Sequence, residues 1–174
     1  AVFNTEQLAD VIEGKGGVLE AAAGAPRTML NVTTSDPDKV AALAARIAPK
    51  GVTLLEVPIS GTSEQIVQGD GVGLIGGERA AFEACGDILD AICPKRYFTG
   101  AVGNGAKTKL AVNLILGLNR AALAEGLVFA ERLGLDPRAF LEVARGSAAY
   151  SQIMDVKGER SEEHTSELQS HLNL

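Results

Sequence analysis

The sequence predicts an α/β protein in which a doubly wound sheet is followed by a long helix that opens an all-α domain. In residues 1–102, strand-like and helix-like stretches alternate over short connections. Residues 52–57 are apolar almost without interruption, as is typical of a strand covered on both faces. From Gly103 the alternation stops, and a stretch rich in Ala and Leu and free of Pro continues to Leu133.

The first two strands and the helix between them follow from residue type and spacing. Residues 1–3 are predicted to end a strand, and residues 5–12 carry apolar side chains at helical spacing. Residues 27–33 are predicted to form the next strand.

A second helix is expected directly after that strand. Ser35 or Asp36 would cap its N-terminus, with Pro37 in the first turn. One apolar face is formed by Val40, Leu43 and Ile47.

The rest of the α/β part contains three more strands and one helix. The predicted segments are, in order, strand 52–57, loop 58–63, strand 72–75, helix 80–92 and strand 96–99.

A long helix is then expected from Asn104 to Leu133, ending at Gly134. A shorter helix, residues 137–145, would be capped by Asp136. The expected domains are residues 1–102 for the α/β part, 103–159 for the start of an all-α domain and 160–174 for a tail.

Composition excludes some classes of partner. The 174 residues are 46% hydrophobic, carry a net charge of −6 and have a pI near 5.0, with scattered Lys and Arg. Neither nucleic acid nor an anionic membrane is therefore expected as a partner. We also expect no apolar run long enough to cross a bilayer and no secretory signal, so a cytoplasmic protein is predicted.

The rare residues limit the chemistry. Both histidines, His164 and His171, lie in the last eleven residues, so Ser-His-Asp or Cys-His catalysis and most catalytic zinc sites are not available to the body of the chain. No metal site is predicted. Cys85 and Cys93 are expected to be reduced and buried, in preference to forming a disulfide or a metal site.

Residues 160–171 (RSEEHTSELQSH) differ from the rest of the chain because they are polar and acidic. They resemble the translation of a common sequencing-library adapter, and a native solvated tail is the alternative. We expect this segment to contribute nothing to the fold.

The start of the long helix contains the residues best suited to proton transfer. Gly103 and Gly105 bracket a helix N-terminus, where backbone N–H groups lie open to a ligand. Lys109 and Asn113 are one turn apart on one face, beside the apolar stripe Leu110, Leu114 and Leu118. Partial burial and the helix dipole would lower the lysine pKa toward a working range. A solvated surface lysine is the alternative that pattern alone favours.

The spacing G-x-G-x-x-x-K-x-x-x-N of Gly103 to Asn113 resembles the catalytic signature of the β-hydroxyacid dehydrogenases, the family of 3-hydroxyisobutyrate dehydrogenase and tartronate semialdehyde reductase. The resemblance covers residues 1 to about 159. It implies a partial Rossmann-like sheet that lacks its first βαβ unit, NAD or NADP as cofactor, Lys109 as the catalytic residue and Asn113 as a substrate contact.

Two further segments match the family in the same order. Residues 57–62 (VPISGT) resemble its P-V-S-G-G substrate loop, and residues 31–37 (NVTTSDP) resemble its D-x-S-T-x-x-P segment. The resemblance implies substrate binding by Ser60, Gly61, Thr62 and Asn113, and cofactor binding by Asn4, Thr34, Gly103 and Gly105.

The sequence also departs from the family. Thr62 replaces the second glycine of the substrate loop, which leaves the substrate open. Val112 stands where 6-phosphogluconate dehydrogenases have histidine, and Lys109 is usually absent from imine reductases, so both branches are disfavoured. The G-x-G-x-x-G turn of the cofactor site is expected to precede residue 1, so we expect the chain alone to be inactive.

The resemblance predicts a fragment of an NAD(P)-dependent oxidoreductase that acts on a small β-hydroxy carboxylic acid or the corresponding semialdehyde, with a homo-oligomeric parent. The alternative is a noncatalytic scaffold or oligomerisation module, whose long helix buries its Ala- and Leu-rich face against a partner. The surroundings of the Lys109 ammonium discriminate the two: a cleft near Ser60 or Asn113 favours the enzyme, and bulk solvent favours the scaffold.

Overall fold

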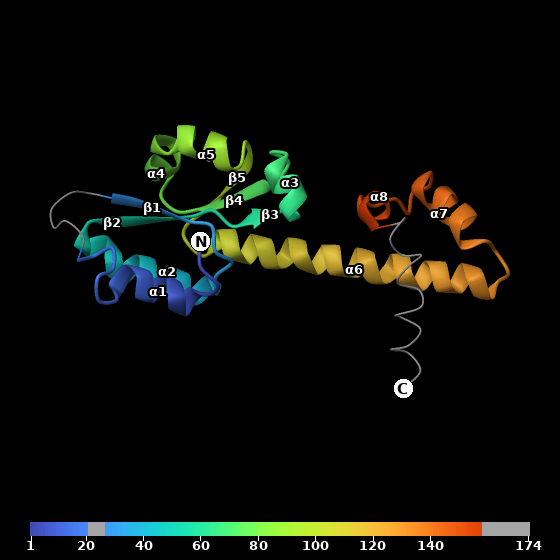
Figure 1. Cartoon of the computed structure of the whole chain (residues 1–174), viewed down its shortest axis with the longest axis horizontal. Helices are drawn as coiled ribbons and strands as arrows, with labels where there is room; N and C mark the ends of the chain where they lie inside the picture. The colour runs from blue at the N-terminus through green and yellow to red at the C-terminus, as the bar shows by residue number, and fades with distance from the viewer. Residues whose placement is uncertain (21–26, 158–174) are drawn as a thin grey trace. The chain divides into compact units, whose positions relative to one another are not determined.

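The computed structural model describes residues 1–20 and 27–157 (Figure 1). The chain divides into two compact units, Ala1–Ala111 and Val112–Leu174, which are treated separately below. The predicted tail 160–174 lies outside the described residues.

The first unit contains a five-stranded sheet formed by β1 (Arg27–Asn31), β2 (Val52–Glu56), β3 (Ile59–Ser60), β4 (Val72–Gly76) and β5 (Lys95–Gly100). β1 pairs with β2 and β4 pairs with β5 in parallel. β4 pairs antiparallel with β2 at one position and with β3 at two. The predicted α/β sheet is confirmed, but it is mixed, because β2 continues through Val57 and Pro58 into β3 and both run against β4.

β2 packs against helices on both faces of the sheet. Val52 and Leu54 pack with α1 (Thr5–Glu13) and α2 (Pro37–Ile47). Leu55 and the following Val57 belong to the cluster on the other face, with residues of α4 (Arg79–Ala84) and α5 (Gly86–Ile92). Figure 1 shows α1 and α2 on one face of the sheet and α4 and α5 on the other. Because successive strand residues point to opposite faces, a strand covered on both faces requires a nearly continuous apolar run.

The helix caps follow the predicted chemistry. Asp36 caps α2 by accepting hydrogen bonds from the amides of Asp38 and Lys39, and Pro37 lies in the first turn. The buried residues of α2 are Val40, Leu43 and Ile47, as predicted. α1 is capped by Asn4, whose Oδ1 accepts from the amide of Gln7 at 2.8 Å.

Three local predictions were wrong. Residues 1–3 do not form a strand, because the amide of Val2 donates to the side-chain Oγ1 of Thr33 instead of joining a ladder. The helix predicted for 80–92 is broken at Cys85 into α4 and α5. The loop predicted for 58–63 contains β3 and the start of α3 (Ser63–Val67).

The second unit contains most of α6 (Asn104–Arg132), α7 (Pro137–Arg145) and α8 (Ile153–Lys157). Gly134 has a φ of 82° just beyond α6, and Asp136 caps α7, as predicted. A small core joins the three helices and consists of Leu123, Leu127, Leu141, Ala144, Ile153 and Met154.

α6 overturns one expectation about membranes. By length and composition alone, this 29-residue helix is long and apolar enough to cross a bilayer, contrary to the prediction that no such run exists. Arg120 and Glu125 interrupt its apolar stretch, and its core-facing residues Leu123 and Leu127 are buried against α7 and α8.

The cysteines are free thiols, as predicted. Cys85 and Cys93 both lie in the core between the sheet and α4–α5, and burial raises the pKa of the Cys93 thiol. Within residues 1–20 and 27–157, no three His, Cys, Asp or Glu side chains cluster as metal ligands would.

Candidate functional site

Lys109 lies in the second turn of α6 and turns back onto the substrate loop. Its Nζ donates a 2.7 Å hydrogen bond to the carbonyl oxygen of Ile59, the residue just before Ser60. The side chain is half-buried, and burial lowers the pKa of its ammonium below the ordinary value of 10.5. The carbonyl holds the ammonium in place, and the partial burial makes this lysine lose its proton more readily than a solvated one would.

Lys107 provides an internal comparison on the same helix. It lies two residues earlier and is exposed, so it behaves as the solvated surface lysine of the alternative. Lys109 differs from it, because Lys109 is half-buried and hydrogen-bonded. Neither of its two expected neighbours, Ser60 and Asn113, is its hydrogen-bond partner. The carbonyl it contacts belongs to the predicted loop.

The loop itself is built by a glycine and a helix cap. Gly61 has a φ of 152°, which favours glycine, and a Cβ there would lie 3.3 Å from the Cα of Gly71. Thr62 caps α3 in a capping box: its Oγ1 accepts from the amide of Gln65, and its own amide donates to the Gln65 side chain at 2.8 Å. The Thr62 amide is therefore occupied, while Ser60 is half-buried and Gly61 is exposed.

The residues predicted near the nicotinamide lie on two tied segments. The amide of Val2 donates to Thr33 Oγ1 at 2.9 Å, and the amide of Asp36 donates to Thr5 Oγ1 at 2.9 Å. These bonds hold the segment of Asn4 beside that of Thr34, just past the carboxyl end of β1. Thr34 is exposed, whereas the Asn4 side chain already caps α1.

Sequence reasoning missed Glu56, the most unusual side chain near this site. It is the last residue of β2 and only 1% exposed. Its Oε2 accepts a 2.5 Å hydrogen bond from the amide of Gly103. The amides of Gly105 and Ala106 also donate to the carboxylate. Its position in the apolar run 52–57 was the available signal, because a charged residue there needs partners.

This arrangement changes the role expected for the two glycines of the α6 start. The Gly103 and Gly105 amides were expected to lie open to a ligand, but Glu56 already accepts hydrogen bonds from them. Their small size matters instead: a Cβ on Gly105 would lie 2.5 Å from the carbonyl oxygen of Leu74. A cofactor contact at these glycines stays a prediction and would have to use other atoms.

The stretch of α6 that follows Lys109, residues 110–118, is largely exposed. Asn113 is solvent-accessible, as are Leu114 and Leu118, which are 65% and 60% exposed. Leu110, at the end of the first unit, is 54% exposed. No described residue covers the predicted apolar stripe.

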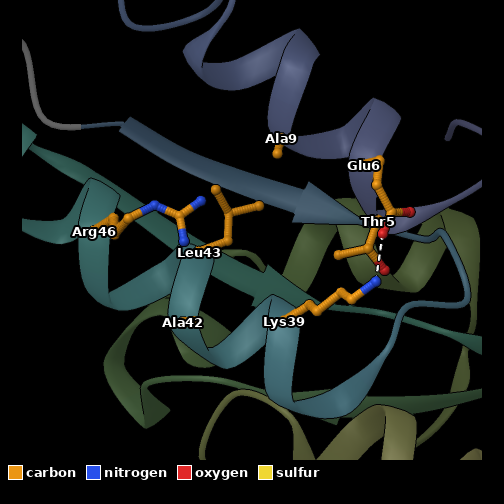
Figure 2. Close-up of a pocket in the computed structure, with 7 residues that line it drawn as sticks. All are labelled: Thr5, Glu6, Ala9, Lys39, Ala42, Leu43 and Arg46. Carbon is orange, nitrogen blue, oxygen red and sulfur yellow. Dashed lines mark hydrogen bonds and ion pairs between the residues drawn. The ribbon is translucent and has the colours of Figure 1, made fainter.

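A hollow of about 220 Å³ lies elsewhere, between α1 and α2 (Figure 2). Its cations are already paired: Lys39 Nζ lies 2.5 Å from the carboxylate of Glu6 (Figure 2), and Arg46 pairs with Glu13 at 2.8 Å. None of the predicted site residues lines it, so we assign it no role in the chemistry.

Two family models together match nearly the whole chain. The model described as the NAD binding domain of 6-phosphogluconate dehydrogenase matches residues 1–101. The model described as NAD-binding of NADP-dependent 3-hydroxyisobutyrate dehydrogenase matches residues 103–174.

Relatives and solved structures are similar to this chain over most of its length. Glyoxylate/succinic semialdehyde reductase 2 of Arabidopsis thaliana is 31% identical over 153 residues, which cover 88% of this chain and 42% of the relative. Cytokine-like nuclear factor N-PAC of Aedes aegypti is 33% identical over 157 residues, which cover 90% of this chain and 28% of that protein. The chain thus spans half or less of the length of these relatives.

The structure of Mycobacterium tuberculosis 3-hydroxyisobutyrate dehydrogenase with L-serine superposes with a TM-score of 0.76 at 23% identity. The match covers 86% of this chain and 50% of that one. At this identity the likeness shows the fold.

Proposed function

This chain belongs to the β-hydroxyacid dehydrogenase family, and on that premise we propose that it supplies the substrate loop and the catalytic lysine of an NAD(P)-dependent oxidoreductase. The substrate class is a small β-hydroxy carboxylic acid or the corresponding semialdehyde. The observation that carries the proposal is the half-buried Lys109 ammonium on the Ile59 carbonyl, one residue from Ser60.

Lys109 acts as the general acid/base. Oxidation of a secondary or primary alcohol removes a hydride from the carbinol carbon and a proton from its hydroxyl, leaving a carbonyl. The neutral Lys109 amine accepts that proton and becomes an ammonium; in the reductive direction the ammonium returns it to the carbonyl oxygen. Burial supports this role because it favours the neutral amine.

Ser60 and Gly61 hold the substrate carboxylate. The Ser60 hydroxyl can donate a hydrogen bond, and the exposed backbone of Gly61 lies next to it. Thr62 contributes through its hydroxyl proton, since its amide is bonded to Gln65. Asn113 orients the substrate from the next turn of α6. Such positioning converts weak contacts into a reactive geometry.

Part of the site fits a nicotinamide cofactor. The exposed Thr34 hydroxyl lies just past the carboxyl end of β1, where dinucleotides bind in open α/β sheets. Asn4 lies on the neighbouring segment. When bound, the nicotinamide accepts or donates the hydride. The residues of this chain that would hold it are Asn4 and Thr34, together with Gly103 and Gly105 at the start of α6.

The alternative, a noncatalytic oligomerisation module, has one observation in its favour. The exposed apolar side chains Leu114, Ile115 and Leu118 of α6 are suited to packing against a second copy of the protein. Such a homo-oligomer is compatible with an enzyme as well. The surroundings of Lys109, and not the exposed face of α6, therefore distinguish the two functions. A scaffold has no need of a half-buried Lys109.

The test uses the longest form of the protein that contains this chain, assayed with NAD and NADP against a panel of β-hydroxy acids. Lys109→Ala should lower kcat by ~10²–10⁴, the usual cost of removing a positioned general base. Cofactor affinity, measured by fluorescence titration, should stay close to that of the wild type.

Lys107→Ala is the matched control, because it removes an exposed lysine from the same turn region of the same helix. It should leave kcat and KM unchanged. Wild-type turnover by folded Lys109→Ala protein would exclude the enzymatic role that we assign.

A further inference from the structure

We propose that Glu56 is a positioning residue, which holds the start of α6 so that the Lys109 ammonium is kept on the substrate loop. This inference rests on the proposed function for its catalytic meaning. Its structural content, that Glu56 determines the surroundings of Lys109, stands without it.

The Glu56 carboxylate joins the end of a strand to the start of a helix. Glu56 is the last residue of β2 and is 1% exposed. Its partners are the amides of Gly103, at 2.5 Å, and of Gly105 and Ala106, all at the N-terminus of α6. These amides have no partner within a helix, and the positive end of the helix favours an anion there.

The packing around this carboxylate leaves no room for a side chain at Gly76 or at Gly105. A Cβ on Gly76 of β4 would lie 2.5 Å from Oε2 of Glu56 and 3.0 Å from the amide of Gly105. A Cβ on Gly105 would meet the Leu74 carbonyl oxygen at 2.5 Å and Pro58 at 3.3 Å. Two glycines thus allow the helix start, β4 and Glu56 to approach closely.

The backbone amides at the start of α6 require a side chain at position 56 that only accepts hydrogen bonds. Three N–H groups face the Glu56 side chain, so an ionised carboxylate satisfies all of them, whereas a glutamine would turn its own NH₂ toward one or more donors. Burial raises the pKa of Glu56, and the three amides oppose that rise. A buried carboxylate is costly to place in a strand, which argues that its contacts serve more than filling space.

The contact lies on the same two elements as the Lys109 hydrogen bond. Glu56 and Ile59 are three residues apart on the β2–β3 segment, and Gly103 and Lys109 are six apart on the α6 segment. The carboxylate binds the helix start at one point, and Lys109 Nζ binds the Ile59 carbonyl at another. Two points fix both the position and the rotation of the first turns of α6 against the loop.

The test measures Lys109 directly and needs no activity. The 174-residue protein is acetylated with limiting reagent across a series of pH values, and the labelling of Lys109 is quantified by peptide mass spectrometry. The internal reference for reagent is Lys15, an exposed lysine just after α1; Lys107 is not used, because its charge acts on the Glu56 carboxylate. In the wild type, Lys109 should titrate below the ordinary lysine pKa because of its burial. In Glu56→Gln, its midpoint should move upward toward the ordinary value.

Glu78→Gln is the matched control, since Glu78 occupies the N-cap position of α4 but makes no side-chain hydrogen bond there. It should leave the Lys109 midpoint unchanged. If Glu56→Gln loses its helical circular dichroism, the Lys109 midpoint is measured in Gly76→Ala instead. The added methyl group displaces the carboxylate while Glu56 itself remains. An unchanged Lys109 midpoint in a folded variant, or loss of folding in both, would overturn the proposal.

Activity then separates this inference from the proposed function. If the Lys109 midpoint moves but Lys109→Ala retains full turnover, Glu56 positions a lysine that is not catalytic and the proposed function fails alone. If Lys109 is essential for turnover but its labelling midpoint is unchanged in Glu56→Gln, the positioning role fails alone. If both hold, Glu56→Gln should lower kcat with a smaller change in KM.

Discussion

Two parts of α6 have surroundings opposite to what their polarity alone would suggest: the polar start is largely buried against the sheet, and the apolar stretch after it is exposed. The first part, residues 104–109, is tied to the sheet by the Glu56 carboxylate and the Lys109 hydrogen bond. The part that follows, Leu114 to Leu118, is apolar, yet Leu114, Ile115 and Leu118 are each at least 60% exposed. One continuous helix thus contains an anchored segment, where the catalytic lysine is positioned, and an apolar segment that the described residues leave largely uncovered.

Two glycines, one in each part of α6, test whether the first part is closely packed and the second is not. Gly105→Ala places a methyl group 2.5 Å from the Leu74 carbonyl oxygen, a backbone atom that cannot move aside easily. We expect overpacking of ~1–3 kcal/mol, which outweighs the gain in helix propensity. Thermal unfolding followed by circular dichroism should show a lower Tm, and an unchanged Tm would mean that the helix start is not closely packed.

Gly117→Ala is the counterpart in the open part of α6. An added Cβ there meets no atom within 4 Å, and the residue lies in the helix interior. The substitution should therefore stabilise the helix by about 1 kcal/mol through propensity alone. A Tm that falls instead would show that another chain packs closely against Gly117.

The elements with strong local signals were predicted from the sequence. The caps of α2 and α7 by Asp36 and Asp136 were correct because an Asp followed directly by Pro determines a helix start by local chemistry. The α/β architecture followed from the alternation of segments. The direction of β4 against β2 was not predicted, since it depends on pairing between distant segments and not on local residues.

The candidate site was likewise predicted where local residues determine it and missed where distant contacts do. The spacing of Lys109 and Asn113 was visible in the sequence, but the partner of Lys109 was not, because a carbonyl 50 residues away carries no sequence signal. Glu56 was overlooked for the same reason: the amides that stabilise it lie 47 to 50 residues further on. Sequence indicates which side chains could act, and tertiary contacts decide which are placed to do so.

The pH dependence of turnover tests the central claim, that Lys109 in the anchored part of α6 is the general base. Oxidation needs the neutral amine, so its rate should rise as pH rises through the Lys109 pKa, which burial holds below 10.5. Reduction needs the ammonium, so its rate should fall over the same range. Lys109→Arg keeps a positive charge at all working pH values and should lose both limbs along with most of the activity. A rising limb that persists in Lys109→Arg, with the wild-type midpoint, would contradict the account.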